Sequence, residues 1–152
     1  MNRVGPCSRV LNLLLVALLL LPAAAFCQEG KKTLPDAATA RSLTGAVMAK
    51  VAAGDMEAGL RLMQPYVVIT DAELDAAITQ AKQQLPVMTQ RFGMTVGAEF
   101  LREDQVGQRL LRITQAQLFE RHAARWSFYF YRTPRGRILN TFQYDDNIKS
   151  FF

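Results

Sequence analysis

The stretch Trp126–Asp146, "WSFYFYRTPRGRILNTFQYDD", carries seven aromatic residues and decides the fold of the chain. Its first half alternates strictly, and alternation is the side-chain period of a β-strand. The Pro and Gly of Thr133–Gly136 are typical of a tight turn. The stretch therefore predicts an antiparallel hairpin. One face of its first strand holds Trp126, Phe128 and Phe130, and one face of its second strand holds Ile138, Asn140, Phe142 and Tyr144.

The sequence before this hairpin predicts two more strands. Val96, Ala98 and Phe100 alternate with polar residues, and residues 109–119 form a second extended segment. A turn over residues 120–124 joins that segment to the aromatic hairpin. The four strands follow one another along the chain, as in an antiparallel meander.

Helical patterns precede the strands. Asp36 is a suitable N-cap for a first helix that ends at Gly54, and Asp55 caps a second, short one. Thr70 and Glu73 have the spacing of a capping box, which predicts the start of a third helix. We expect Pro86 to kink this helix or limit its packing, and Gly93 to end it. The apolar stripe of the third helix consists of Leu74, Ile78, Ala81, Leu85, Met88 and Phe92.

Helices followed by an antiparallel meander predict an α+β domain over residues 36–152, in which N-terminal helices pack on a curved four-stranded antiparallel sheet. The aromatic side chains of residues 126, 128 and 130 are expected to form the wall against which the helices pack. Residues 28–35, which are polar and short, are expected to be a flexible mature N-terminus.

Residues 1–27 have the pattern of a signal peptide. Arg3 and Arg9 precede the apolar run Leu11–Leu21, and small residues follow it. The run is shorter than the about 20 residues of a membrane-spanning helix. We expect cleavage after Ala25 or Cys27 and a periplasmic or secreted protein. The alternative is a lipoprotein anchored at an acylated Cys27, although Phe26 occupies a position where such sites have Gly or Ala.

The composition of the mature chain excludes some classes of protein. After loss of the leader, 16 Lys and Arg stand against 13 Asp and Glu, a net charge of +3 that is too weak to predict nucleic-acid binding. Cleavage after Cys27 leaves no cysteine, so no disulfide is expected. His122 is the only histidine, and neither a metal site nor a cofactor is predicted. Asp145 and Asp146 are expected to cap a final helical turn rather than to act as a catalytic pair.

The order of elements resembles the nuclear transport factor two-like, or cystatin-like, cone superfamily. Gly54-Asp55 between the first helices and the turn Gly136-Arg137-Ile138 are similar to features of small secreted bacterial members, and the resemblance covers Asp36 to Phe152. It implies a site at the mouth of the cone, between the concave face of the sheet and the helices. Enzymes of this superfamily place an Asp, His or Tyr inside the cone. The superfamily also contains isomerases, dehydratases and partner-binding modules, so the fold implies no activity.

The expected site in the cone is apolar and carries only an amide and a phenol as hydrogen-bonding groups. Such a site suits a small apolar ligand with one polar end, and no catalytic residue is predicted there. The candidate ligand-binding residues are Trp126, Phe128, Asn140, Phe142 and Tyr144.

A second candidate surface lies on the opposite face and at the hairpin end. Arginines alternate with aromatics there, which suggests a patch for an anion or an acidic protein partner. The alternative is a solvated sheet edge that its charges protect. The candidate partner surface consists of Tyr129, Tyr131, Arg132 and Arg135.

These observations favour a secreted, non-catalytic domain that binds a small apolar ligand or a protein partner. One alternative is a small isomerase-like or hydrolase-like enzyme that uses Asn140, Tyr144 and Asp145 in the cone. The other is a structural envelope module that self-associates through its sheet as a homodimer.

Overall fold

The computed structural model describes residues 30–152, so the expected leader, its cleavage sites and Cys27 lie outside the described residues. The described part folds as an α+β domain in which the helices precede the strands, as the sequence predicts. Its helices are α2 (Ala37–Ala52), α3 (Met56–Arg61) and α4 (Asp71–Phe92). Its strands are β1 (Thr95–Val106), β2 (Leu110–Phe119), β3 (Ala123–Thr133) and β4 (Gly136–Asp145), and the 3-10 helix η2 (Ile148–Phe151) follows them.

The helix starts lie where the capping residues predict them. The Asp36 carboxylate accepts a hydrogen bond from the Thr39 amide at 2.7 Å, and Asp55 accepts one from the Ala58 amide at 3.0 Å. At the start of α4, Thr70 and Glu73 form both bonds of the capping box. Gly93 ends α4 with a φ of +90°. Because each N-cap satisfies amides that the helix itself leaves free, the local sequence determines where these helices start.

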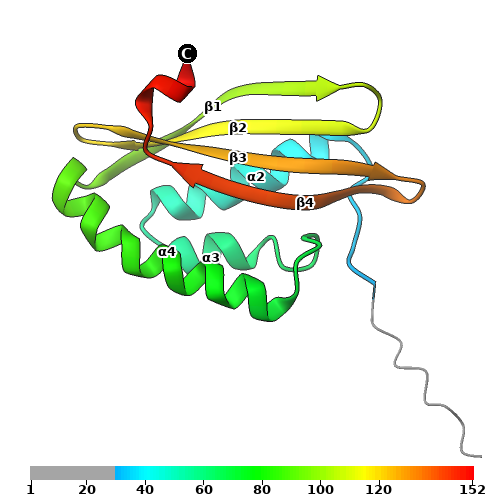
Figure 1. Ribbon diagram of the computed structural model, residues 1–152, viewed down its shortest axis with the longest axis horizontal. Coiled ribbons are helices and arrows are strands. Elements are labelled where there is room, and N and C mark those ends of the chain that lie inside the picture. The colour runs from blue at the N-terminus through cyan, green and yellow to red at the C-terminus, as the bar shows by residue number, and fades with distance from the viewer. Residues whose placement is uncertain (1–29) are drawn as a thin grey trace, which may run out of the picture. The chain divides into compact units, whose positions relative to one another are not determined.

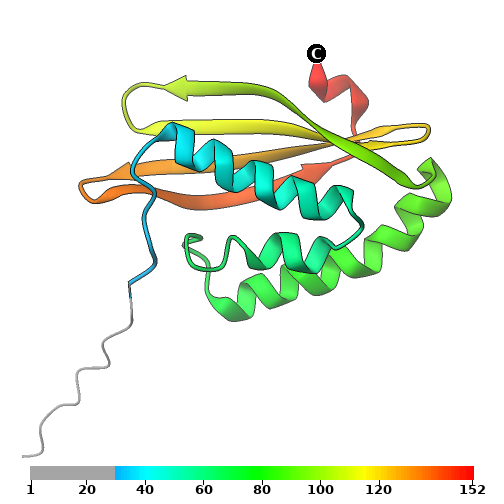
Figure 2. The ribbon, with the colours of Figure 1, turned by 180° about the vertical axis from the view of Figure 1, so that it is seen from behind.

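The strands form one curled antiparallel sheet in the order β1-β2-β3-β4. All three described helices lie on one face of the sheet, and η2 lies on the other (Figures 1 and 2). Within the helical layer, α2 packs against β1 and β2, and α3 packs between α2 and α4. We call the face that the helices cover the inner face and the opposite one the outer face.

The predicted aromatic wall is the centre of the core. Trp126, Phe128 and Phe130 are at most 1% exposed. Apolar side chains from every described helix pack around them, including Val47, Met48, Leu60, Leu74 and Ile78. The expectation that these rings form the surface on which the helices pack is confirmed.

A β-bulge corrects the predicted inner face of β4. Phe130 pairs with Leu139 but Tyr129 pairs with Thr141, so Asn140 is an extra residue on β4. The extra residue reverses the alternation of β4 at that point. Before the bulge, Leu139 is buried on the inner face and Ile138 lies opposite Tyr131 on the outer face. After it, Phe142 and Tyr144 return to the inner face, opposite Phe128 and Trp126.

The segment before α2 packs against the rest of the domain. Leu34 is buried, and its amide and carbonyl both bond to the backbone of Arg137 on β4. The Lys32 amide donates to the carbonyl of Pro65, and the Lys31 ammonium contacts Asp71. The domain therefore begins at Lys31, and the first half of β4 has a neighbour on its open side.

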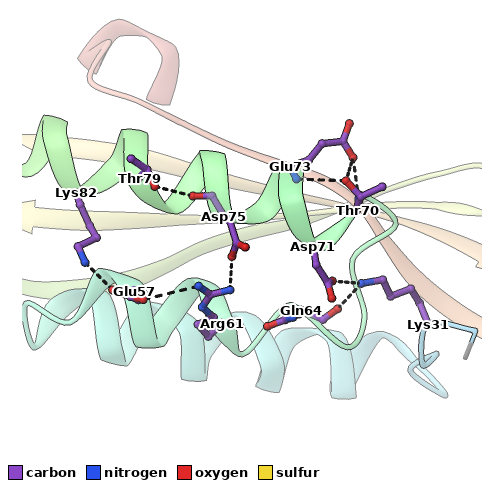
Figure 3. Close-up of polar contacts among 10 residues, drawn as sticks. All are labelled: Lys31, Glu57, Arg61, Gln64, Thr70, Asp71, Glu73, Asp75, Thr79 and Lys82. Atoms are coloured by element: carbon purple, nitrogen blue, oxygen red, sulfur yellow. Dashed lines mark hydrogen bonds and ion pairs between the residues drawn. The ribbon is translucent and has the colours of Figure 1, made fainter.

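Charged side chains join α3 to α4 (Figure 3). Glu57 and Arg61 on α3 face Lys82 and Asp75 on α4, and Arg61 contacts both Glu57 and Asp75. The Lys31 ammonium adds a contact to Asp71 at 2.7 Å and another to the Gln64 carbonyl at 3.1 Å. Although each exposed pair contributes little alone, together they join α4 to α3 and to the segment that precedes α2.

Candidate functional site

A groove lies between α4 and β4 because α4 is buried along its first half and at its last residue, but not between Ala81 and Phe92. Leu74, Ile78 and Ala81 are buried in the main core, and Phe92 is buried in a second cluster with Phe119 and Ala124. Between them α4 runs unbroken through Pro86, and Val87 is 63% exposed. Residues 82–91 of the helix thus lie beside the sheet edge without filling the space next to it.

The groove has two halves that share the side chains of Gln84 and Tyr144. We call the whole feature the α4–β4 groove. One half has a volume of about 440 Å³ and is lined by Gln83, Gln84, Val87, Met88, Arg91, Phe92, Tyr144, Asp145 and Asp146. The other has a volume of about 300 Å³ and is lined by Ile69, Ala77, Gln80, Gln84, Thr141, Phe142, Gln143 and Tyr144.

Tyr144 stands at the centre of the groove in a fixed position. Its ring stacks on Trp126 with the centroids 4.7 Å apart, and its hydroxyl donates to Oε1 of Gln84 at 2.7 Å. Burial raises the pKa of the Tyr144 phenol above its ordinary value of 10.0. Tyr144 therefore presents a neutral ring edge and a hydroxyl that is already oriented by a neighbour.

Paired charges occupy one end of the groove. Arg91 on α4 contacts the Asp146 carboxylate at 3.3 Å. The ring of His122 stacks on Phe92 at 4.1 Å, and one of its nitrogens lies 2.8 Å from the carbonyl oxygen of Asp146. His122 is thus held by neighbours at the end of α4, rather than standing free in solvent as its place at a turn suggests.

The structure brings together only part of the predicted ligand-binding set. Phe142 and Tyr144 line the groove. Trp126 and Phe128 are fully buried behind them, so they support the groove wall from the core side. Asn140 is exposed at the bulge and is not part of the lining, which corrects its predicted place beside Phe142 and Tyr144.

The residues of the enzyme alternative do not converge. The Asp145 carboxylate accepts hydrogen bonds from Arg125, and it also accepts the amide of Asn147 and the hydroxyl of Ser150. These bonds brace the turn before η2, but the N-cap of η2 is Asn147, whose side chain accepts a hydrogen bond from the Lys149 amide, so the capping role expected for Asp145 and Asp146 is corrected. Asn140 lies four residues from Tyr144, about 13 Å along a strand. Within residues 30–152, no cluster of three or more His, Cys, Asp and Glu side chains is placed to hold a metal ion.

The predicted partner surface is divided between two faces. Tyr129 and Tyr131 lie on the outer face, as alternation predicts, and the Tyr131 hydroxyl accepts a bond from Arg109. Arg132 pairs with Arg137, and alternation along β3 puts its side chain on the face opposite to Tyr129 and Tyr131. Arg135 lies in the exposed turn, where its carbonyl accepts a hydrogen bond from the Thr33 hydroxyl. On the outer face, Tyr131 instead belongs to a cross-strand apolar row made of Val106, Leu110, Tyr131 and Ile138.

A second groove lies on the outer face, beside η2. Its volume is about 380 Å³, and we call it the η2 groove. The hydroxyl of Thr114, which is 2% exposed, has no hydrogen-bond partner among the described residues. The lining is Glu99, Leu101, Arg102, Thr114, Ala116, Leu118, Ala123, Arg125, Ile148, Phe151 and Phe152.

Sequence reasoning missed the α4 side of the α4–β4 groove. Gln84 and Val87 lie off the apolar stripe of α4, and Met88, which is part of the stripe, is only partly buried. The signal that could have found them is an apolar residue outside the stripe, Val87, directly after a proline. Such a residue is exposed unless something else covers it.

Among the described helices, none has the length and apolar character of a membrane-spanning segment.

Comparison with known proteins adds no relative to this picture. No family model, no curated protein and no solved structure matches the chain.

Proposed function

We propose that this chain is a secreted, non-catalytic domain that binds an apolar group in the α4–β4 groove. The observation that carries the proposal is the groove itself, which opens beside a fully buried aromatic wall and has the neutral Tyr144 at its centre. Concave surfaces with apolar walls and a few oriented polar groups are the usual form of a binding site.

The lining matches a neutral ligand group better than a charged one. Phe142, Val87 and Met88 supply apolar surface, and the amides of Gln80, Gln83 and Gln84 can donate and accept hydrogen bonds without charge. The carboxylates at the end of the groove are engaged with Arg91 and Arg125. Proton abstraction at neutral pH needs a free base in reach of the substrate, and the lining favours binding over such chemistry.

The expected leader supports the same proposal. A chain with the pattern of a signal peptide reaches the periplasm or the exterior. A binding domain there can meet a ligand or a partner that does not enter the cytoplasm. The apolar occupant is then either a small molecule with one polar end or an apolar side chain of another protein.

The test is binding of the amphiphilic dye anilinonaphthalene sulfonate, whose aromatic rings serve as the apolar group, to the purified protein, followed by NMR of the backbone amides. We expect shifts in residues 83–92 and 144–146, which line the larger half of the groove. Val87→Glu should weaken dye binding by roughly tenfold because it replaces apolar lining with a hydrated carboxylate that faces the apolar rings of the dye. Gln90→Glu adds the same charge to an exposed position three residues later, outside the lining, and should leave binding nearly unchanged.

Shifts confined to the η2 groove, or equal weakening by the two variants, would refute the proposed site. The natural occupant is then sought by mass spectrometry of molecules that co-purify with the wild-type protein and not with Val87→Glu.

A further inference from the structure

The two edges of the sheet are built differently. The β1 edge carries two register shifts, at Val96 and Leu101. It also carries the charged residues Glu99, Arg102, Glu103 and Asp104. Bulges and charges are the devices by which proteins keep an edge strand from pairing with another chain. The β1 edge is therefore protected against strand addition.

The β4 edge lacks these devices in its second half. Its first half is covered, since Arg137 pairs with Leu34 and Leu139 pairs with Val67. From Thr141 to Tyr144 the strand carries no charged side chain, and within residues 30–152 no segment pairs with this part of the edge. The open part of β4 is also the part that forms one wall of the α4–β4 groove.

In this open part of β4, the backbone amides and carbonyls of every second residue point away from β3. The amides and carbonyls of Arg137 and of Leu139 point away from β3, because they bond to the covering segments. Backbone direction alternates along an antiparallel strand, and the extra residue at Asn140 moves the alternation by one. Phe142 and Tyr144 therefore direct their amides and carbonyls to the open side, whereas Gln143 directs its own to β3.

We infer that the occupant of the α4–β4 groove is an extended segment of a partner protein that pairs with β4 from Phe142 to Tyr144 and extends the sheet by one strand. The inference rests on the proposed function and adds the kind of partner. Strand addition beside a helix gives affinity through backbone bonds and specificity through pockets for alternate side chains. Here the two halves of the groove lie on either side of the contact between Gln84 and Tyr144.

The order of the two halves along β4, one beside Phe142 and Tyr144 and the next beside Tyr144 and Asp146, fits side chains i and i+2 of an extended segment. Such side chains lie on one face and are separated by about 6.6–6.8 Å along the strand. One half of the groove borders Phe142 and the other borders Asp146, with Tyr144 between them. The segment would place two inward side chains in the groove, while the residues between them face solvent.

The lack of free charge in the groove lining defines the chemistry of that segment. The half that borders Phe142 has no charged residue in its lining, and in the other half Arg91 is already paired with Asp146. An inward charge on the partner would lose its hydration without gaining a counter-ion. The inward positions must therefore be neutral and apolar, such as Val or Ile, and the segment must be free of proline where its amides face β4.

The experiment uses a blocked five-residue peptide, acetyl-Thr-Val-Thr-Val-Thr-amide, and the amide hydrogen exchange of the purified protein. With the peptide at about ten times its dissociation constant, exchange of the Phe142 and Tyr144 amides should slow about tenfold, because only about a tenth of the sites remain free. The Gln143 amide, which faces β3, should change little. Replacing both Val residues of the peptide by Asp should abolish the protection.

Methylation of the peptide amides tests the strand pairing itself. Alternate amides of an added strand face β4, so methyl groups on one alternate set should abolish protection while methyl groups on the other set leave it. Equal effects of the two sets would overturn the inference. Binding of the small dye in the groove without protection of Phe142 and Tyr144 by the peptide would also overturn it, and would leave the proposed function standing.

A second copy of the chain is the rival occupant. Protection of Phe142 and Tyr144 that appears without peptide and grows with protein concentration, together with dimers in analytical ultracentrifugation, would show β4 pairing with itself. That result would replace the partner segment by a homodimer.

Discussion

Trp126 connects the core of the domain to its groove. Its ring stacks on Phe128 on the core side, with the centroids 6.2 Å apart, and on Tyr144 on the groove side. Its indole nitrogen donates to Oε1 of Gln117 at 3.2 Å, and the Gln117 amide donates in turn to Thr95. A fully buried Trp is tolerated because its one polar atom has a partner.

Replacing Trp126 with Ala should therefore destabilise the domain strongly. Truncation of a buried Trp costs about 3–5 kcal/mol, a large part of the about 5–15 kcal/mol that stabilises a typical domain. Chemical denaturation of the wild type and Trp126→Ala measures the difference. Tyr131→Ala, which truncates an exposed ring on the same strand, is the control and should cost much less. A Trp126→Ala midpoint equal to that of the wild type would contradict the structure.

Arg137 is a buried cation whose Nη1 atom has no partner among the described residues. The side chain is 7% exposed and lies where Leu34 covers β4. A buried charge without a good partner loses hydration without full compensation, and an apolar side chain of similar size often serves as well or better. We expect Arg137→Met to unfold at the same or a higher denaturant concentration. A loss of more than about 1 kcal/mol, the scale of one hydrogen bond, would show that the guanidinium is satisfied after all.

Between elements, α2 and α3 approach each other closely at Gly59. A Cβ atom at this position would lie 2.9 Å from the Val47 carbonyl oxygen and 3.2 Å from Cγ2 of Val51. The first distance is shorter than real contacts of a Cβ atom, and its partner is backbone. The absence of a side chain at residue 59 thus allows the two helices to pack at this distance.

Two glycine-to-alanine variants separate helix propensity from packing. Gly45 lies inside α2 with open space where its Cβ would be, so Gly45→Ala should stabilise the protein by about 0.5–1 kcal/mol. Gly59→Ala gains the same propensity but must push α3 away from α2, and should be destabilising. The test compares the denaturation midpoints of the two variants. Stabilisation by both would show that the helices can move apart without cost.

The caps and ion pairs of the helical layer predict acid sensitivity. The Thr70 amide lowers the pKa of Glu73 below 4.5, and the Lys82 ammonium lowers that of Glu57 below the same value. The Lys31 ammonium lowers the pKa of Asp71 below 3.8. A carboxyl with a lowered folded pKa stabilises the fold above its unfolded pKa and loses this contribution as pH falls through the folded value.

The melting temperature should thus be flat near neutral pH and fall as pH drops below about 4.5, the ordinary pKa of a glutamate. Glu73→Gln keeps a side chain that can complete the capping box but cannot titrate. Its melting curve should depend less steeply on pH in the acid range. Parallel pH profiles for the variant and the wild type would contradict the assigned role of Glu73.

For the whole molecule, the sequence predicts what local chemistry controls. The Thr70–Glu73 box, the caps at Asp36 and Asp55 and the alternation from Trp126 to Tyr131 each depend on neighbours along the chain. Together these patterns predict the α+β class and the helix-then-meander order correctly. The bulge at Asn140 could not be predicted, because the sequence keeps its period of two through this position. Only the pairing with β3 reveals the extra residue.

The candidate site was predictable in part for the same reason. Phe142 and Tyr144 belong to a local alternating pattern, so their common face could be inferred. The α4 side depends on where a helix leaves the core, which is a property of tertiary packing around Pro86. The docking of Lys31–Leu34 on Pro65, Asp71 and Arg137 is likewise invisible in a short polar segment.

Export remains a prediction for the chain as a whole. Cleavage after Ala25 or Cys27 would give a mature protein that begins at Phe26 or Gln28, a few residues before the first contacts of Lys31. Intact mass and N-terminal analysis of fractionated cells measure this directly. A full-length cytosolic product would contradict the expectation of secretion, and a lipid adduct on Cys27 would support the lipoprotein alternative.

The bridge between Leu34 and Arg137 also bears on the order of folding. Each strand pairs with its neighbour along the chain, so the meander forms through short loop closures, which are fast. The bridge instead joins residues from opposite ends of the domain, and closing so long a loop costs more entropy. We expect this clasp to form last during folding and to open first in the native state. Hydrogen exchange at the Leu34 and Arg137 amides should then be faster, and less sensitive to denaturant, than exchange at the centre of β3. Equal exchange at the two places would mean that the clasp and the sheet open as one unit.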